Sequence, residues 1–85
     1  MTQARIRLSP ELANLGRSTW EELITEANLG IESAEIARRY FINHECQIDI
    51  AIDKNTDRTQ ISRVLGKAKR KIEMTFQKTY NIYNQ

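Results

Sequence analysis

The sequence is poor in the residues that build disulfides and metal centres, with one cysteine and one histidine among its 85 residues. Because Cys46 is the single thiol, an intrachain disulfide and a zinc site of four cysteines are both excluded. Because His44 is the single imidazole, a two-histidine metal site is excluded as well. We therefore expect no metal or other cofactor, and a reducing cytoplasm as the location of the protein.

Long apolar segments are missing too. No run approaches the roughly 18 apolar residues of a membrane span, and residues 1–8 lack the apolar core of a signal peptide. We therefore expect no association with a membrane.

Proline and glycine are scarce, with one proline and three glycines, and no repeat, linker or low-complexity stretch divides the chain. With 40% hydrophobic and 28% charged residues, the composition is typical of a globular chain. Residues 1–85 are therefore expected to form a single domain, too small for a catalytic cleft around a large substrate. His44 and Cys46 lie two residues apart, but nothing orients them as base and nucleophile, so the sequence does not predict an enzyme.

The net charge of +2 hides an uneven distribution of charge along the chain. Residues 1–53 contain nine acidic and five basic side chains, whereas residues 54–71 contain seven basic side chains and one acid. A concentrated basic segment in an otherwise acidic small protein indicates a polyanionic partner, although a solvated helix face would show the same composition. Charge alone does not distinguish a polyanion-binding segment from a solvated helix face, so the residues between the charges must be considered.

Three short helices are expected in the first half of the chain. The first lies at residues 9–15 with Pro10 in its first turn. Ser18 begins the second through a capping box, and Gly30 is its expected C-cap. Ser33 begins the third. The apolar residues of the second and third helices recur at helical spacing and are Trp20, Leu23, Ile24 and Ala27, then Ile36, Ala37, Tyr40 and Phe41.

Residues 47–53 alternate between polar and apolar side chains, a pattern that by itself predicts a β-strand. We nevertheless expect a helix, because the residues that follow fit a helix-turn-helix register. An apolar stripe with steps of three and four residues then predicts one long helix from about residue 58 toward the C-terminus. The stripe consists of Ile61, Leu65, Ala68, Ile72, Phe76, Tyr80 and Tyr83. The predicted fold class is all-α, with about four to five helices and a long C-terminal one.

Residues 47–66 meet the packing requirements of a DNA-binding helix-turn-helix, in which two helices cross beside a tight turn. Ala51 supplies the small residue at the crossing, and Asn55 tolerates the left-handed conformation needed in the turn. Asp57 and Gln60 form a capping box for the second helix. The inward-facing residues are Ile50, Ile61 and Val64. Two positions where an apolar residue is usual hold Lys54 and Thr56.

A rival register begins at residues 35–40, which resemble the first helix of a common helix-turn-helix. Its second half fits poorly. Phe41 would have to adopt the left-handed conformation in the turn, and Gln47 would fall at an inward-facing apolar position. We therefore favour the register at residues 47–66.

The stretch from Thr19 to Glu73 resembles the KorA/TrfB family of plasmid-encoded transcriptional repressors, and it aligns with the family pattern without a gap over about 55 of the 85 residues. The matching positions are the helix around Trp20, Gly30, Glu35-Ile36-Ala37-Arg38, Gln47, Ala51, Arg58, Ser62, Val64, Leu65 and Glu73. The ungapped spacing of the whole set is more specific than any one of its strings.

The resemblance implies an all-helical, homodimeric repressor of plasmid promoters that binds palindromic operators and lies with the bacterial nucleoid or a plasmid. It places Arg58 and Ser62 at the DNA surface and gives Gln47 a phosphate contact. Arg63 replaces the family's base-reading glutamine, and Lys67 replaces an arginine. Because arginine pairs with guanine and glutamine with adenine, we expect an operator that differs from the family type.

The second helix of the motif is expected to enter the major groove with its N-terminal end first, and Arg63 is the leading base reader. The predicted DNA-binding residues are Gln47, Lys54, Arg58, Thr59, Ser62, Arg63, Lys67, Lys69, Arg70 and Lys71. The family's dimerisation segment is shortened here to residues 74–85, where the candidate interface residues are Phe76, Tyr80, Ile82 and Tyr83. Packing of those side chains on their own subunit is the alternative. With no separate ligand domain, we expect control by concentration rather than by a small molecule.

Two other functions fit the sequence less well. An antitoxin or small adaptor could share the motif and bind a partner protein through the C-terminal helix. A non-specific nucleic-acid binder would also use the basic segment, although residues 54–71 lack the aromatic side chains on which single-stranded bases stack.

Overall fold

The computed structural model describes residues 8–80, and it describes their side chains from residue 8 to residue 79. This part of the chain contains helices and no strand, which confirms the all-α fold and the long C-terminal helix. The elements are α1 (Pro10–Ala13), α2 (Arg17–Ala27), α3 (Ile31–Ala37), the π-helical segment η1 (Arg38–Ile42), α4 (Gln47–Asp53) and α5 (Arg58–Tyr80).

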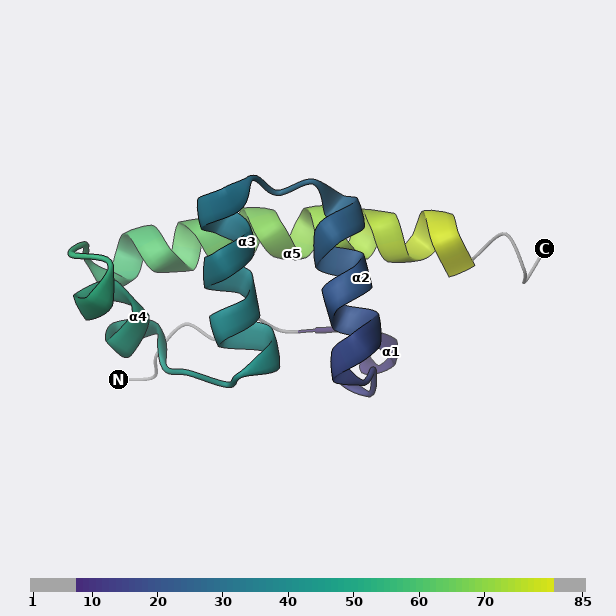
Figure 1. Ribbon diagram of the computed structural model, residues 1–85, viewed down its shortest axis with the longest axis horizontal. Helices are drawn as coiled ribbons and strands as arrows, with labels where there is room; N and C mark the ends of the chain where they lie inside the picture. The colour runs from purple at the N-terminus through teal and green to yellow at the C-terminus, as the bar shows by residue number, and fades with distance from the viewer. Residues whose placement is uncertain (1–7, 81–85) are drawn as a thin grey trace.

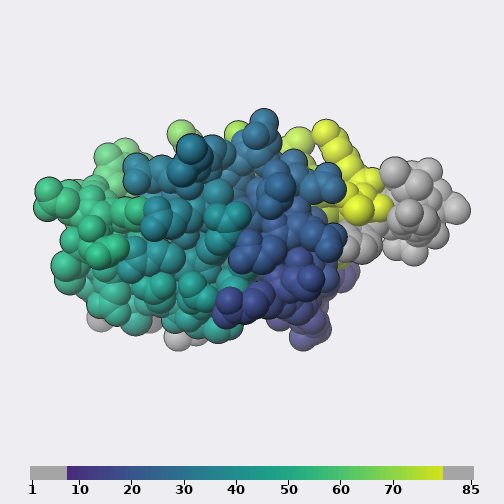
Figure 2. All heavy atoms as spheres, viewed as in Figure 1, coloured from purple at the N-terminus to yellow at the C-terminus, as the bar shows by residue number. Residues whose placement is uncertain are grey.

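Helix α5 runs the length of the molecule, and the other helices pack along it (Figure 1). Helices α2 and α3 stand side by side across its middle, and α4 lies at its N-terminal end. The short α1 lies beside the start of α2. In Figure 2 the atoms of α2, α3 and α4 fill the near face, so that α5 is visible there only along the upper edge and at one end.

One hydrophobic cluster joins these elements. The α5 side chains Ile61, Leu65, Ala68 and Ile72 are all buried, which confirms the predicted stripe over this length. Trp20 is 4% exposed and stacks on Phe41 with the ring centroids 5.2 Å apart, so it is the core anchor expected from the sequence. No helix in residues 8–80 is long and apolar enough to cross a membrane.

Helix α3 does not stop where its α-helical hydrogen bonding ends. It continues into η1, where the backbone N–H of Asn43 donates to the carbonyl of Arg38, five residues earlier, over 3.0 Å. This wider turn is rare and inserts one extra residue into the helix. Both Phe41 and Ile42 at its end are buried.

Three predicted helix boundaries are wrong. Helix α2 begins at Arg17 after Gly16, so Ser18 lies inside it rather than capping it. It ends at Ala27, and its C-cap Asn28 adopts the left-handed conformation (φ 56°) expected of Gly30. Gly30, at φ 93°, is instead the residue before α3. Helix α3 begins at Ile31, two residues before the predicted start at Ser33. Asparagine tolerates the left-handed conformation, so α2 terminates before the glycine.

The alternating segment is helix α4, as predicted from the motif and against its periodicity. Ile50 is fully buried, whereas Ile48 is 44% and Ile52 72% exposed. Residues four apart share a helix face, so Ile48 and Ile52 lie together on the outer side of α4 while Ile50 faces the core. The alternating apolar residues therefore lie on two different faces of a helix, and the segment is not a strand.

Candidate nucleic-acid interface

Helix α4, a four-residue turn and the start of α5 form the helix-turn-helix arrangement expected for residues 47–66. Ala51 is 3% exposed and Ile61 1% exposed, so the small residue and the inward-facing residue lie in the core where the helices meet. The backbone N–H of Thr56 donates to the carbonyl of Ala51 over 2.9 Å. Asn55 has a φ of 57°, which confirms the left-handed turn residue.

The start of α5 is capped as predicted. The backbone N–H of Gln60 donates to Oδ1 of Asp57 over 2.9 Å. This hydrogen bond satisfies one of the N–H groups that the first turn of a helix leaves without a partner. It fixes the point at which the turn ends and the basic helix begins.

The rival register is excluded. It requires a left-handed residue at Phe41, but Phe41 lies within η1 and is buried. The left-handed residue in this region is His44, at φ 59°, three positions later. Cys46, which precedes α4 as its N-cap residue, is exposed.

The face of α5 turned away from the core is basic. Arg63, Lys67 and Arg70 follow one another at steps of four and three and are exposed, on the side opposite Ile61 and Leu65. Six cations are spread along residues 58–71, and none of them forms an ion pair within the described part of the chain. These are Arg58, Arg63, Lys67, Lys69, Arg70 and Lys71. Lys71 is exposed too, whereas Arg58 and Lys69 are partly buried.

The two polar residues expected beside these bases also lie on accessible positions. Thr59 is exposed, and Ser62 is partly buried. Both are within the first turns of α5, where a helix that enters a groove with its N-terminal end would place its contacts.

Two bases outside α5, Arg38 and Arg39, form ion pairs with carboxylates. Nε of Arg38 lies 2.7 Å from Oε1 of Glu21. Arg39, whose side chain is 19% exposed, binds Oε1 of Glu45 at 2.8 Å and Oδ2 of Asp53 at 2.6 Å. The hydrogen bonds to Glu45 and Asp53 raise the pKa of the Arg39 guanidinium above its ordinary value. These two cations are neutralised internally, unlike the six cations of residues 58–71.

Lys54 is a correction to the predicted interface. Its side chain is 18% exposed, and Nζ lies 2.5 Å from Oε1 of Glu35 and 3.7 Å from Oε2 of Glu32. The hydrogen bond to Glu35 raises the pKa of Lys54 above its ordinary value. Lys54 thus ties the turn to α3 and does not extend toward a DNA backbone. Its α3 partners lie 19 and 22 residues earlier, so no local pattern shows the contact.

Gln47 is a second correction. It is the first residue of α4, but it is only 5% exposed. A side chain that contacts phosphate must reach solvent, so the burial of Gln47 is incompatible with the expected contact. Glutamine is a polar residue, so Gln47 was expected at the surface, but the packing of α4 buries it.

The predicted dimer residues are only partly described. Phe76 is partly buried and packs against the core cluster of its own chain, which was the alternative to the dimer interface. The side chain of Tyr80, and Ile82 and Tyr83, lie outside the described residues. Met74, which no pattern in the sequence singled out, is 58% exposed on α5.

No family model, no curated protein and no solved structure matches the chain. The resemblance to the KorA/TrfB family therefore depends on the residue spacing in the sequence alone. Within residues 8–80 no group of three or more acidic, histidine or cysteine side chains is placed to hold a metal ion.

Proposed function

We propose that the protein is a sequence-specific transcriptional repressor that binds double-stranded DNA as a homodimer and controls plasmid promoters. The observation that supports this most directly is the basic face of α5. Arg63, Lys67 and Arg70 on this face, like the other cations of residues 58–71, lack acidic partners among the described residues. The helix begins at a capped turn after α4. A basic stripe on such a helix is the electrostatic footprint of a duplex-binding protein.

In this proposal the first half of α5 lies in the major groove. A helix of 23 residues is about 34 Å long, whereas the groove is roughly 12 Å wide. The N-terminal turns therefore make the base contacts, and the part that packs against α2 stays outside. Arg63 reads a base, with guanine O6 and N7 as its preferred partners.

The remaining polar and basic side chains of this face position the protein on the duplex. Lys67, Arg70 and Lys71 contact backbone phosphates, and Thr59 and Ser62 make phosphate or water-mediated contacts. Arg58, at the start of the helix, reads a base or binds a phosphate. A dimer then occupies an inverted repeat whose half-sites are about one helical turn apart, and it represses by excluding polymerase.

The test is a titration at fixed salt concentration against the DNA upstream of the protein's own gene, with scrambled duplex as competitor. We expect specific binding to be tighter by about 10³-fold or more. Arg63→Ala should remove most of this difference because alanine cannot donate hydrogen bonds to the base. Lys78→Ala is the matched control, since Lys78 is an exposed base on the same helix beyond the basic segment. Equal affinity for both duplexes, or none for either, contradicts the proposal.

The second candidate function is an antitoxin or adaptor that binds a partner protein through the end of α5. The exposed Met74 favours it, because that part of the helix presents an apolar side chain. A toxin gene beside this one would support the antitoxin, whereas replication or conjugation genes would support the plasmid repressor. Met74→Ser should weaken the partner complex and leave DNA affinity unchanged if the antitoxin interpretation is correct.

A further inference from the structure

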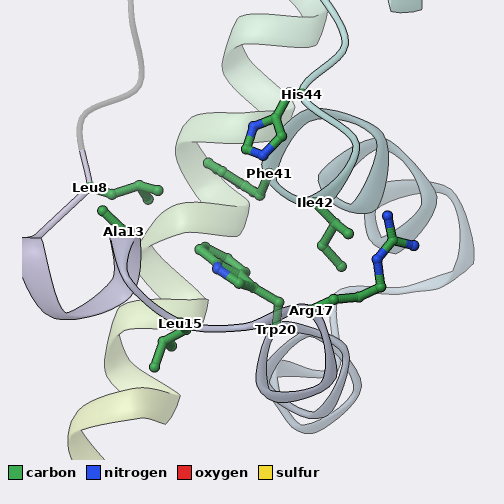
Figure 3. Close-up of a pocket in the computed structure, with 8 residues that line it drawn as sticks. All are labelled: Leu8, Ala13, Leu15, Arg17, Trp20, Phe41, Ile42 and His44. Atoms are coloured by element: carbon green, nitrogen blue, oxygen red, sulfur yellow. The ribbon is translucent and has the colours of Figure 1, made fainter.

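A pocket of about 390 Å³ lies among residues of α1, α2, η1 and the segments beside them (Figure 3). This volume is within the range of small-molecule sites. Trp20 lies in the middle of the group in Figure 3, with Leu8 and Leu15 on one side and His44, two residues beyond η1, on another. These residues belong to the N-terminal part of the molecule, whereas the basic face belongs to α5.

The inner wall of the pocket is aromatic and rigid. Trp20 and Phe41 are 4% and 5% exposed, and their rings stack with an angle of 11° between the planes. Leu15 adds an aliphatic edge. Little of either ring is exposed, so this wall offers apolar contact to a ring or a branched apolar group rather than an open aromatic face.

The polar groups of the pocket are predominantly hydrogen-bond donors. Arg17 lines it and uses one guanidinium nitrogen to bind Oδ1 of Asn43 at 3.2 Å, which leaves further N–H groups exposed. The imidazole of His44 lies at the rim. Within residues 8–80 the indole N–H of Trp20 forms no hydrogen bond. No carboxylate is among the residues that line the pocket.

We propose that this pocket binds a small apolar carboxylate, with its ring or branched chain against Trp20 and Phe41. The carboxylate is held by the guanidinium of Arg17 and the ring of His44, because charge-assisted hydrogen bonds from arginine suit a carboxylate. His44 adopts the left-handed backbone conformation, which is uncommon for a residue other than glycine. This binding site does not depend on the proposed DNA binding, and it replaces the expectation that no small molecule is involved.

The test uses the full chain and the emission of Trp20, which is the single tryptophan of the sequence. Titration with 4-phenylbutyrate should produce a saturable change in emission. The uncharged 4-phenylbutanol should bind at least about tenfold more weakly, because it lacks the carboxylate. N-acetyltryptophanamide under the same titration controls for collisional quenching.

Two variants assign the effect to this pocket. Arg17→Ala should reduce the affinity for 4-phenylbutyrate to that for the alcohol, with the fold checked by circular dichroism. Lys78→Ala, which removes an exposed base of α5 outside the pocket, should leave both affinities unchanged. Should Arg17→Ala not fold, Ala13→Leu narrows the pocket from α1 and should weaken both compounds. An emission change that does not saturate up to about 10 mM overturns the proposal, and so does equal affinity for acid and alcohol. Wild-type affinity for 4-phenylbutyrate in Arg17→Ala also overturns it. Where Arg17→Ala does not fold, wild-type affinity in Ala13→Leu has the same meaning.

Discussion

At the scale of single residues, the turn between α4 and α5 depends on the backbone of Asn55. Its φ of 57° lies in the left-handed region, where most side chains clash with the following carbonyl group. Asparagine and glycine tolerate this conformation. The turn that joins α4 to α5 therefore depends on the identity of one exposed residue.

Replacement of Asn55 tests this dependence. Asn55→Ala should lower the free energy of unfolding by about 1 kcal/mol, because alanine is strained in the left-handed region. Asn55→Gly should change it by only a few tenths of a kcal/mol. Urea unfolding followed by circular dichroism measures both. Thr56→Ala, at the next and also exposed position, is the control. An equal loss for alanine and glycine would contradict the backbone explanation.

Asn55 and Lys54 show how far local sequence determines this site. The conformation of Asn55 follows from its residue type and its distance from Ala51, so it could be predicted. The role of Lys54 depends on Glu32 and Glu35, which reach the turn only after α3 has packed beside α5. Its positive charge was visible in the sequence, but its partners were not.

At the scale of elements, α4 is a helix whose sequence alternates like a strand. In a helix Ile50 faces the core and Ile52 faces outward, whereas in a strand they would share one face. This difference gives the two isoleucines, only two residues apart, unequal roles.

Truncation of each isoleucine distinguishes the two geometries. Ile50→Ala should destabilise the protein by about 2–5 kcal/mol, since it leaves a cavity in the core. Ile52→Ala should change stability by no more than about 0.5 kcal/mol, because the side chain is mostly exposed. Chemical denaturation of the two variants provides the comparison. Similar losses in both would mean that α4 does not present Ile50 alone to the core.

Helix boundaries and helix interiors differ in how well they could be predicted. The stripe from Ile61 to Ile72 follows from regular spacing, so it was predicted correctly. The end of α2 depends on which of two suitable residues, Asn28 or Gly30, adopts the left-handed conformation. No residue type or spacing in the sequence marks the π-helical turn of η1, so it was not predicted.

At the scale of the whole molecule, the fold separates charge. The cations Arg38, Arg39 and Lys54 are bound to carboxylates, while those of residues 58–71 are not paired within the described chain. The first group is neutralised within the fold, whereas the second keeps its charge available to a partner. The unpaired basic side chains therefore occupy residues 58–71, a shorter stretch than the basic segment 54–71 of the sequence.

This separation predicts the salt dependence of DNA binding. Lys71→Ala should reduce the slope of log K against log salt concentration by about 0.9 for each phosphate that the variant no longer neutralises. Lys54→Met should leave the slope unchanged, because Lys54 is bound to Glu35. Filter binding or fluorescence anisotropy over a range of salt concentrations measures both. A larger effect for Lys54→Met than for Lys71→Ala would show that the turn, and not the helix face, meets the phosphates.

The exposed thiol of Cys46 stands at the entrance to α4, and the sequence contains no other cysteine. Any thiol-directed spin label or dye thus attaches once per chain, at the residue before α4. In a two-fold symmetric complex the pair of labels yields one separation, which reports the distance between the two motifs. Native DNA half-sites one turn apart would require a spacing near 34 Å between the bound helices, so a molecular ruler is already present in the unmodified chain.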